Sequence, residues 1–212
     1  DPRRAEGLMA RAAAARRTSD DKRAAILDAA LALFGRYGYR RTSIDDIARE
    51  AGIAKGTVYL YVENKEALFR GLSQSLLDRV IDDARRAAAG KGEIAARLRA
   101  ILEAKFGFFH DLLHRSPHAS ELLDSKNRLG ADVFAAGDAI YLQVLTKAIA
   151  DAVRRGEIAP KRHGLSAAEV AGLLVAGAHG IDAAPGASLS GEEFRERLGT
   201  LVRVVVAGLG AR

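Results

Sequence analysis

Four side chains suited to contacting nucleic acid lie within one short segment of the chain. They are Lys55, Thr57, Tyr59 and Tyr61. A lysine ammonium neutralises phosphate or binds a guanine edge, while hydroxyl groups hydrogen-bond to phosphate and a tyrosine ring packs on a thymine methyl group. We therefore predict a short helix over about residues 54–61 whose exposed face enters a DNA major groove, with Val58 pointing inward. The other positions of this helix are expected to be small or polar.

A second helix is predicted immediately before it, and both of its ends are marked. Thr42 and Ser43 are N-cap residue types, and Asp45 and Asp46 follow three residues later, as in a capping box. Apolar residues then recur at the spacing of one helix face, at Ile44, Ile47, Ala48 and Ala51. Gly52 is expected to end the helix, because glycine takes a positive φ without steric cost. Two helices joined by such a turn predict a helix-turn-helix, whose second helix reads DNA.

Residues 20–70 carry a set of short motifs in a recognisable order. They are AILDAALALF (25–34), GY (38–39), TS (42–43), IA (47–48), AGI (51–53), GTVY (56–59), Tyr61 and NKEAL (64–68). Together they resemble the amino-terminal domain of the tetracycline-repressor-like (TetR/AcrR) regulators. One departure is Val62, where an aromatic residue is frequent in the family. Because valine is also apolar, we expect it to pack in the same place.

The resemblance implies an all-α fold of about nine helices. A three-helix helix-turn-helix DNA-binding domain would be followed by a helical domain for ligand binding and dimerisation, with the fourth helix linking the two. We place the basic amino-terminal arm at 1–19, the DNA-binding domain at 20–66 and the effector and dimerisation domain at 67–212. The resemblance also implies DNA-contacting positions, which in this sequence are Thr42, Lys55, Thr57, Tyr59, Tyr61 and Lys65. We add Gly56, and also Ser43, because backbone N–H groups at a helix start can hold phosphate.

The composition is compatible with this class. The chain has 212 residues, a formal net charge of +6, four prolines and no cysteine. Few prolines favour helices, the positive charge suits a polyanionic partner, and the lack of cysteine excludes disulfides and thiolate metal sites. No apolar run reaches the ~18 residues of a membrane span; the nearest is 170–181, which His179 interrupts. We expect a cytoplasmic protein with no cofactor and no membrane partner.

The first 19 residues are basic, because their arginines outnumber the two acidic residues, Asp1 and Glu6. The arginines are Arg3, Arg4, Arg11, Arg16 and Arg17. A flexible, solvated arm is the simpler interpretation, and an arm that reaches phosphates or an adjacent minor groove is the alternative. Residues 7–17 are rich in alanine and could extend the first helix, which is expected over about 20–37.

Capping residues and apolar periodicity place the later helices. The fourth should begin after Asn64, and the predicted ranges of the fourth to seventh helices are 64–90, 93–115, 118–124 and 129–155. Ser166 with Glu169, and Ser190 with Glu193, have the capping-box spacing for the starts of the eighth and ninth helices.

The last two predicted helices suggest self-association. The eighth contains small residues that allow close helix approach, at Ala171, Gly172, Ala176, Gly177 and Gly180. The ninth has more apolar residues than one face needs, at Phe194, Leu198, Leu201, Val202, Val204, Val205, Val206 and Leu209. We interpret the pair as a homodimer interface of four helices, and a wholly intramolecular core is the alternative. A two-fold dimer would read two half-sites about one DNA turn apart.

A ligand pocket is predicted from aromatic and polar residues of the fifth, seventh and eighth helices. The candidates are Phe106, Phe109, His110, Phe134, Tyr141 and His179. Such residues can line a mostly apolar pocket with a few polar anchors, but they fit an ordinary aromatic core equally well. His110 and His114, at i and i+4, have a spacing that binds zinc or nickel, although a solvated helix end is the simpler interpretation.

We expect a homodimeric repressor that binds a palindromic operator in double-stranded DNA and is released by an unknown small-molecule effector. Two alternatives stay open: an architectural DNA-binding protein without a ligand, and a metal-responsive regulator that uses the His110 and His114 region. An enzyme is not favoured, because the sequence has no phosphate-binding glycine loop, no nucleophile elbow and no His-Glu-x-x-His motif.

Overall fold

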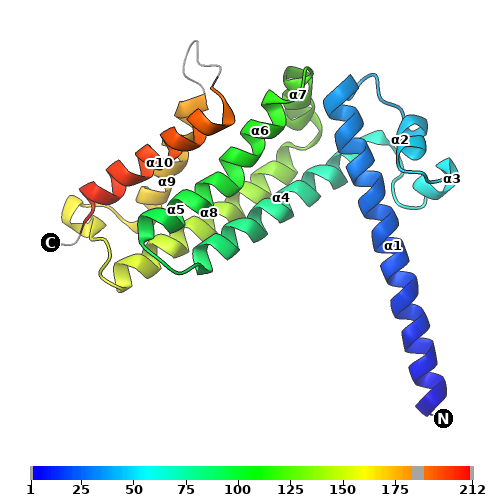
Figure 1. Ribbon diagram of the computed structural model, residues 1–212, viewed down its shortest axis with the longest axis horizontal. Helices are drawn as coiled ribbons and strands as arrows, with labels where there is room; N and C mark the ends of the chain where they lie inside the picture. The colour runs from blue at the N-terminus through cyan, green and yellow to red at the C-terminus, as the bar shows by residue number, and fades with distance from the viewer. Residues whose placement is uncertain (1, 183–188, 211–212) are drawn as a thin grey trace. The chain divides into compact units, whose positions relative to one another are not determined.

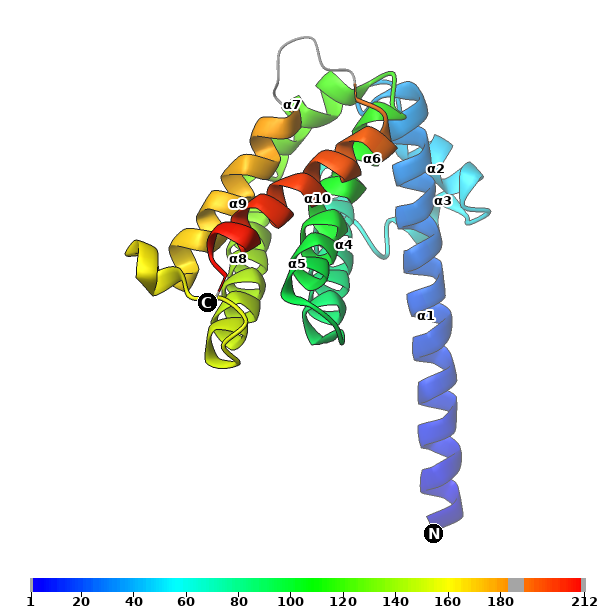
Figure 2. The ribbon, with the colours of Figure 1, turned by 60° about the vertical axis from the view of Figure 1, so that its left-hand side comes forward.

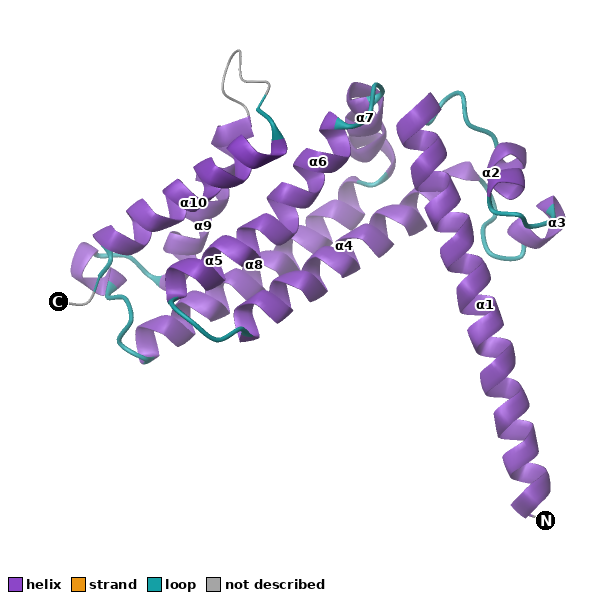
Figure 3. Cartoon of the chain, viewed as in Figure 1, coloured by secondary structure: helices purple, strands orange, loops and turns teal. Residues whose placement is uncertain are grey.

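The computed structural model describes residues 2–182 and 189–210, and over these residues the chain is helical (Figures 1 and 3). The α-helices are α1 (Pro2–Tyr37), α2 (Ile44–Glu50), α3 (Lys55–Val58), α4 (Lys65–Ala89), α5 (Ile94–Leu102), α6 (Phe108–His114), α7 (Ala119–Leu129), α8 (Ala131–Arg154), α9 (Ala167–Asp182) and α10 (Gly191–Gly208). A π-helical segment, Glu103–Gly107, joins α5 to α6 without a break, and a 3₁₀ turn, Pro160–His163, precedes α9. The predicted all-α class is confirmed.

The starts of four helices follow from capping side chains. Ser43, Ser166 and Ser190 each form a capping box with the acidic residue three positions later. Asn64 Oδ1 accepts a hydrogen bond of 2.8 Å from the N–H of Ala67 at the start of α4. Each bond satisfies an N–H group that has no partner within its own helix, which is why these residue types mark helix starts in the sequence.

The helix α1 begins at Pro2, whereas the sequence analysis expected a flexible arm before about Asp20. The alanine-rich composition of residues 7–17 gives the physical reason, because alanine has the highest helix propensity. A contact between this part of the chain and DNA stays a prediction.

The chain folds into two compact units. The first comprises Asp1–Ser73 and Ser116–Gly130, and the second comprises Gln74–Arg115 and Ala131–Arg212. The sequence analysis instead put the boundary after residue 66 and assigned everything beyond it to one domain. The segment 116–130 joins the first unit because α7 packs against α1, and because Arg70 Nη1 donates to the carbonyl of Leu129 at 2.6 Å.

The core of the first unit fixes the helix-turn-helix on α1 and on the start of α4. Ile47 of α2 and Val58 of α3 are fully buried. The rings of Phe34, Tyr39 and Phe69 pack in a triangle, with centroid distances of 5.3, 5.4 and 6.1 Å. These aromatic contacts hold α1, the loop after it and α4 as one support.

The second unit is a bundle in which α9 packs against α8 and α10, and α10 packs against α5 (Figure 2). Its core includes Leu98, Tyr141, Leu145, Ile149, Leu174, Phe194 and Leu198. By length and composition alone α8 is apolar enough to cross a membrane, a property that the sequence analysis did not find. A core helix of a globular protein meets the same criterion, and Tyr141, Leu145 and Ile149 of α8 are buried among the other helices.

Candidate nucleic-acid interface

The turn between α2 and α3 is set by local backbone rules. Gly52 has a φ of +66°, in the left-handed region that favours glycine. The N–H of Ile53 then donates to the carbonyl of Ala48 at 2.9 Å and closes the end of α2. Val58 is buried and anchors α3 on the core. The predicted turn at Gly52 and the inward position of Val58 are both confirmed.

The helix α3 is shorter than the predicted 54–61, because it covers only Lys55–Val58. The chain then continues in tight turns, in which the N–H of Tyr61 donates to the carbonyl of Val58 at 2.9 Å. Tyr61 is half-buried and lines a groove of about 380 Å³ together with Arg23 and Leu27 of α1. A contact between Tyr61 and DNA stays a prediction.

The exposed part of α3 and the turn after it present Lys55, Tyr59 and Leu60 to solvent. Tyr59 is 46% exposed and Leu60 is 83% exposed, whereas Thr57 is half-buried. Gly56 has open space beside its Cα, so another molecule can approach the backbone closely there. Sequence analysis missed Leu60, because it expected only small or polar residues at these positions. An exposed leucine is suited to an apolar contact with a thymine methyl group.

Lys55 already has an anionic partner within the helix-turn-helix. Its Nζ lies 2.6 Å from Oδ1 of Asp45 in α2, and both side chains are exposed. The hydrogen bond that Lys55 donates to Asp45 raises the pKa of Lys55, so the ammonium stays charged. A phosphate that binds Lys55 must therefore compete with the carboxylate of Asp45.

Thr42 and Ser43 use their side chains within the protein. Thr42 is buried, and its hydroxyl donates to the carbonyl of Gly38 at 2.8 Å, at the end of α1. The N–H of Ser43 donates to Oδ2 of Asp46 at 3.0 Å in the capping box, and the hydrogen bonds from Ser43 lower the pKa of Asp46. In this geometry both residues position α2, and their predicted contact with phosphate stays a prediction.

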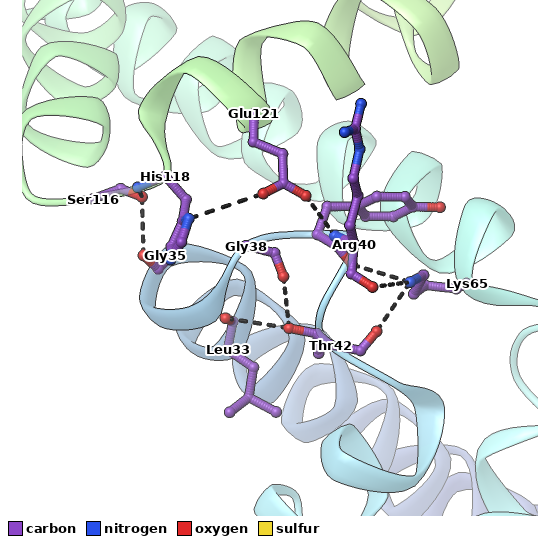
Figure 4. Close-up of polar contacts among 10 residues, drawn as sticks. Leu33, Gly35, Gly38, Arg40, Thr42, Lys65, Ser116, His118 and Glu121 are labelled. Atoms are coloured by element: carbon purple, nitrogen blue, oxygen red, sulfur yellow. Dashed lines mark hydrogen bonds and ion pairs between the residues drawn. The ribbon is translucent and has the colours of Figure 1, made fainter.

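Lys65 ties the start of α4 to the loop between α1 and α2 (Figure 4). Its Nζ donates to the carbonyls of Tyr39 and Thr42 at 3.0 Å each and to that of Arg40 at 3.4 Å. The ammonium also lies 4.6 Å from the ring centroid of Tyr39, whose pKa is raised chiefly by burial. Because these carbonyls occupy the donors of Lys65, its geometry supports a structural role more directly than a phosphate contact.

A second set of polar contacts joins the segment before and within α7 to the end of α1 (Figure 4). Ser116 Oγ donates to the carbonyl of Gly35 at 2.9 Å, and the N–H of Arg40 donates to Oε1 of Glu121. Gly38, with a φ of +85°, passes so close to the Glu121 carboxylate that a Cβ there would collide with it. These contacts were not predicted, because they join residues that lie far apart in the sequence.

Comparisons with known proteins agree with this geometry. Residues 26–72 match the model of the bacterial regulatory proteins of the tetR family. The transcriptional regulator TtgR of Pseudomonas putida is 30% identical over 154 residues, which cover 68% of this chain and 72% of that protein. The chain belongs to the TetR family.

One further relative and one solved structure are also similar to this chain. The fatty acid metabolism regulator protein of Bacillus subtilis is 35% identical over 74 residues, and this match covers 33% of the present chain but only 38% of the relative. The crystal structure of a putative TetR-family transcriptional regulator from Mesorhizobium loti superposes with a TM-score of 0.69 at 21% identity, covering 91% of this chain and 98% of that chain. At that identity the likeness shows the fold alone.

Five of the six predicted ligand residues of this TetR-family chain form two aromatic groups in the second unit. In one, the ring centroid of Phe106 lies 6.3 Å from that of Tyr141 and 4.9 Å from that of His179. In the other, the rings of Phe109 and Phe134 are 6.0 Å apart. The fifth predicted helix corresponds to the continuous rod of α5 and α6, the seventh to α8 and the eighth to α9. The structure thus brings together predicted ligand residues from these three parts of the chain.

His110 packs as a core residue. It is buried, its ring stacks on Phe194 at 4.2 Å and on His114 at 3.8 Å, and its Nε2 lies 3.1 Å from the carbonyl oxygen of Leu189. Over the part of the chain that the structure describes, no group of three or more His, Cys, Asp or Glu side chains gathers to hold a metal ion. A ligand contact at His110 stays a prediction.

Proposed function

We propose that this chain is a sequence-specific transcriptional regulator that acts as a homodimeric repressor on a palindromic operator and is released by a small-molecule effector. The observation that carries the proposal is the exposed surface of α3 and the turn after it, where Lys55, Tyr59 and Leu60 face solvent. The buried side chain of Val58 fixes this segment to the core. A cation, a phenol and an apolar side chain on a rigid support match phosphate, base edges and thymine methyl groups.

Dimer formation is supported by apolar side chains that α9 and α10 leave exposed. Leu173 of α9 is 54% exposed and Val204 of α10 is 67% exposed. Gly172, Ala176 and Ala207 are small exposed residues on the same two helices, which are the predicted eighth and ninth. Burying such surface against a second copy is favourable by about 25 cal/mol per Å² of apolar area. A dimer also presents two copies of α3, as a two-fold symmetric operator requires.

Release by an effector requires only that the effector prefers one conformation of the dimer. If it binds more tightly to a state in which the spacing of the two α3 helices does not fit the operator, the affinity for DNA falls by the same factor as that preference. The helix α4 runs from the helix-turn-helix into the second unit, so it is the continuous element through which such a change would pass.

Selection of bound fragments from a random double-stranded DNA library tests the proposal. The purified protein is expected to enrich fragments that share a palindromic motif. Fragments without any shared motif would contradict sequence-specific regulation and favour an architectural DNA-binding protein. The enriched sequence then serves as the operator for the affinity measurements described below.

A further inference from the structure

The second unit contains a buried ammonium that sequence analysis did not single out. Lys105 lies in the π-helical segment, and its Nζ donates to Oδ1 of Asp138 in α8 at 2.8 Å. The same nitrogen is 4.8 Å from the ring centroid of Tyr141 and 5.2 Å from that of Phe106. Lys105 is therefore held between two aromatic rings and one carboxylate.

The π-helical segment and Tyr141 together set the position of this ammonium. π-Helical turns are rare, occur mostly as single turns inside α-helices and are frequent at functional sites. Just before this one, the buried hydroxyl of Tyr141 donates to the carbonyl of Ile101 at 2.9 Å. Burial raises the pKa of Tyr141, so the hydroxyl stays a neutral donor. The bond attaches α8 to the α5–α6 rod directly beside Lys105.

The ion pair is asymmetric in its exposure to solvent. The side chain of Lys105 is 9% exposed, whereas that of Asp138 is 46% exposed. Among the described residues Asp138 is the one anionic partner of Lys105. A buried ammonium is costly without a counter-charge, but a half-exposed carboxylate loses little by moving into water. An incoming anion can therefore replace Asp138 without leaving either charge desolvated and unpaired.

We propose that Lys105 is the anchor for an organic anion with an apolar body, whose acidic group takes the place of the Asp138 carboxylate. The rings of Phe106 and Tyr141, together with His179 of α9 packed on Phe106, are then the surface that the apolar body contacts. This inference rests on the proposed function in one respect, because the anion would be the effector. It adds the chemical class of that effector and names the residue that selects it.

Two fluorescent probes of the same shape test the charge requirement. They are 8-anilinonaphthalene-1-sulfonate, which is an anion, and N-phenyl-1-naphthylamine, which has the same aromatic body without the sulfonate. The chain has no tryptophan, so the emission of the probes is not complicated by tryptophan fluorescence. The wild-type protein is expected to bind the anionic probe about tenfold more tightly than the neutral one, the scale of one charge-assisted hydrogen bond.

Substitutions of the two charged partners should act in opposite directions. Lys105→Met keeps most of the length of the side chain without its charge and should abolish the preference for the anionic probe. Asp138→Asn removes the competing carboxylate and should strengthen binding of the anionic probe severalfold, with little change for the neutral one. Lys147→Met, at an exposed position of the same helix as Asp138, is the matched control and should retain the wild-type preference.

A purely structural ion pair makes different predictions. In that case Asp138→Asn would destabilise the protein without strengthening the anionic probe, and a folded Lys105→Met variant would keep the wild-type preference. Either result overturns the proposal. Asp138→Asn leaves Lys105 in place, so it decides the matter even if Lys105→Met does not fold. DNA selection is independent of these probes, so loss of the anion site would leave the proposed regulator function standing.

Discussion

At the scale of single residues, Tyr59 and Tyr37 form a natural pair for testing DNA contact. Their exposures are similar, 46% and 49%, but Tyr59 follows α3 while Tyr37 is the last residue of α1. Tyr59→Ala should weaken operator binding by about 1–3 kcal/mol, the scale of one lost specific contact. Tyr37→Ala should leave it unchanged. Titration of the selected operator, followed by fluorescence anisotropy, measures both; equal affinities for the two variants would remove Tyr59 from the interface.

Substitution of Asp45 should strengthen DNA binding rather than weaken it, because its carboxylate competes with phosphate for Lys55. Asp45→Asn should tighten DNA binding severalfold at low salt, because the carboxylate then neither competes with phosphate for Lys55 nor repels the phosphate charge. The gain should shrink as salt screens the charges. Asp82→Asn is a matched control, because Asp82 forms a similarly exposed ion pair with Arg85 in the part of α4 that belongs to the second unit. Weaker binding by Asp45→Asn would instead mean that Asp45 orients Lys55 for its contact.

The residues show which features a sequence can predict. The turn at Gly52 and the capping box at Ser43 depend on neighbours within a few positions, so residue type and spacing were sufficient. The contacts of Lys65 and Lys105 could not be predicted in this way, because the hydrogen-bond partners of each lie 23 or more positions away in the chain. A lysine in a motif signals charge, but only the fold decides whether that charge meets DNA, backbone carbonyls or a carboxylate.

At the scale of elements, the ends of helices can be predicted from local sequence, whereas the packing of helices into units cannot. The caps at Asn64, Ser166 and Ser190 predicted where helices begin, because capping is a local property. The assignment of 116–130 to the first unit was not predictable, since it depends on contacts such as that of Ser116 with Gly35 across 81 positions. The π-helical segment also left no signal in the apolar spacing of the α5–α6 rod.

The contact between α6 and α10 predicts how stability depends on pH. Asp111 of α6 forms an ion pair with Arg195 of α10, and the hydrogen bond from Arg195 lowers the pKa of Asp111. A lowered carboxyl pKa stabilises the folded state above the unfolded value of about 4, and this stabilisation is lost as pH falls through the folded pKa. The free energy of unfolding should therefore fall below about pH 4, and Asp111→Asn should make that fall shallower.

Chemical denaturation at a series of pH values measures this effect. The variant should be less stable than the wild type near neutral pH, and the two curves should converge as the pH is lowered. Parallel curves over the acidic range would show that the pairing of Asp111 with Arg195 does not contribute in solution.

At the scale of the whole molecule, one α3 offers a small surface for reading DNA, so the proposed function requires that two copies be joined. Each unit has its own buried core, while Leu173 and Val204 of the second unit remain exposed. Apolar side chains on two neighbouring helices are a surface that a second copy can cover symmetrically, since each copy supplies the same two helices. Oligomeric state and operator affinity should therefore change together.

The double variant Leu173→Glu with Val204→Glu tests this coupling. Two buried carboxylates per copy would make association unfavourable, because each loses hydration without gaining a partner. We expect a folded monomer that binds the palindromic operator at least about 100-fold more weakly, since both half-sites can no longer be held together. Leu142→Glu, on the exposed surface of α8, is the control and should remain a dimer with normal affinity. Light scattering after size-exclusion chromatography gives the oligomeric state, and anisotropy gives the affinity. A double variant that remains dimeric would place the interface elsewhere, whereas a monomer with full affinity would show that α3 reads its site without a two-fold partner.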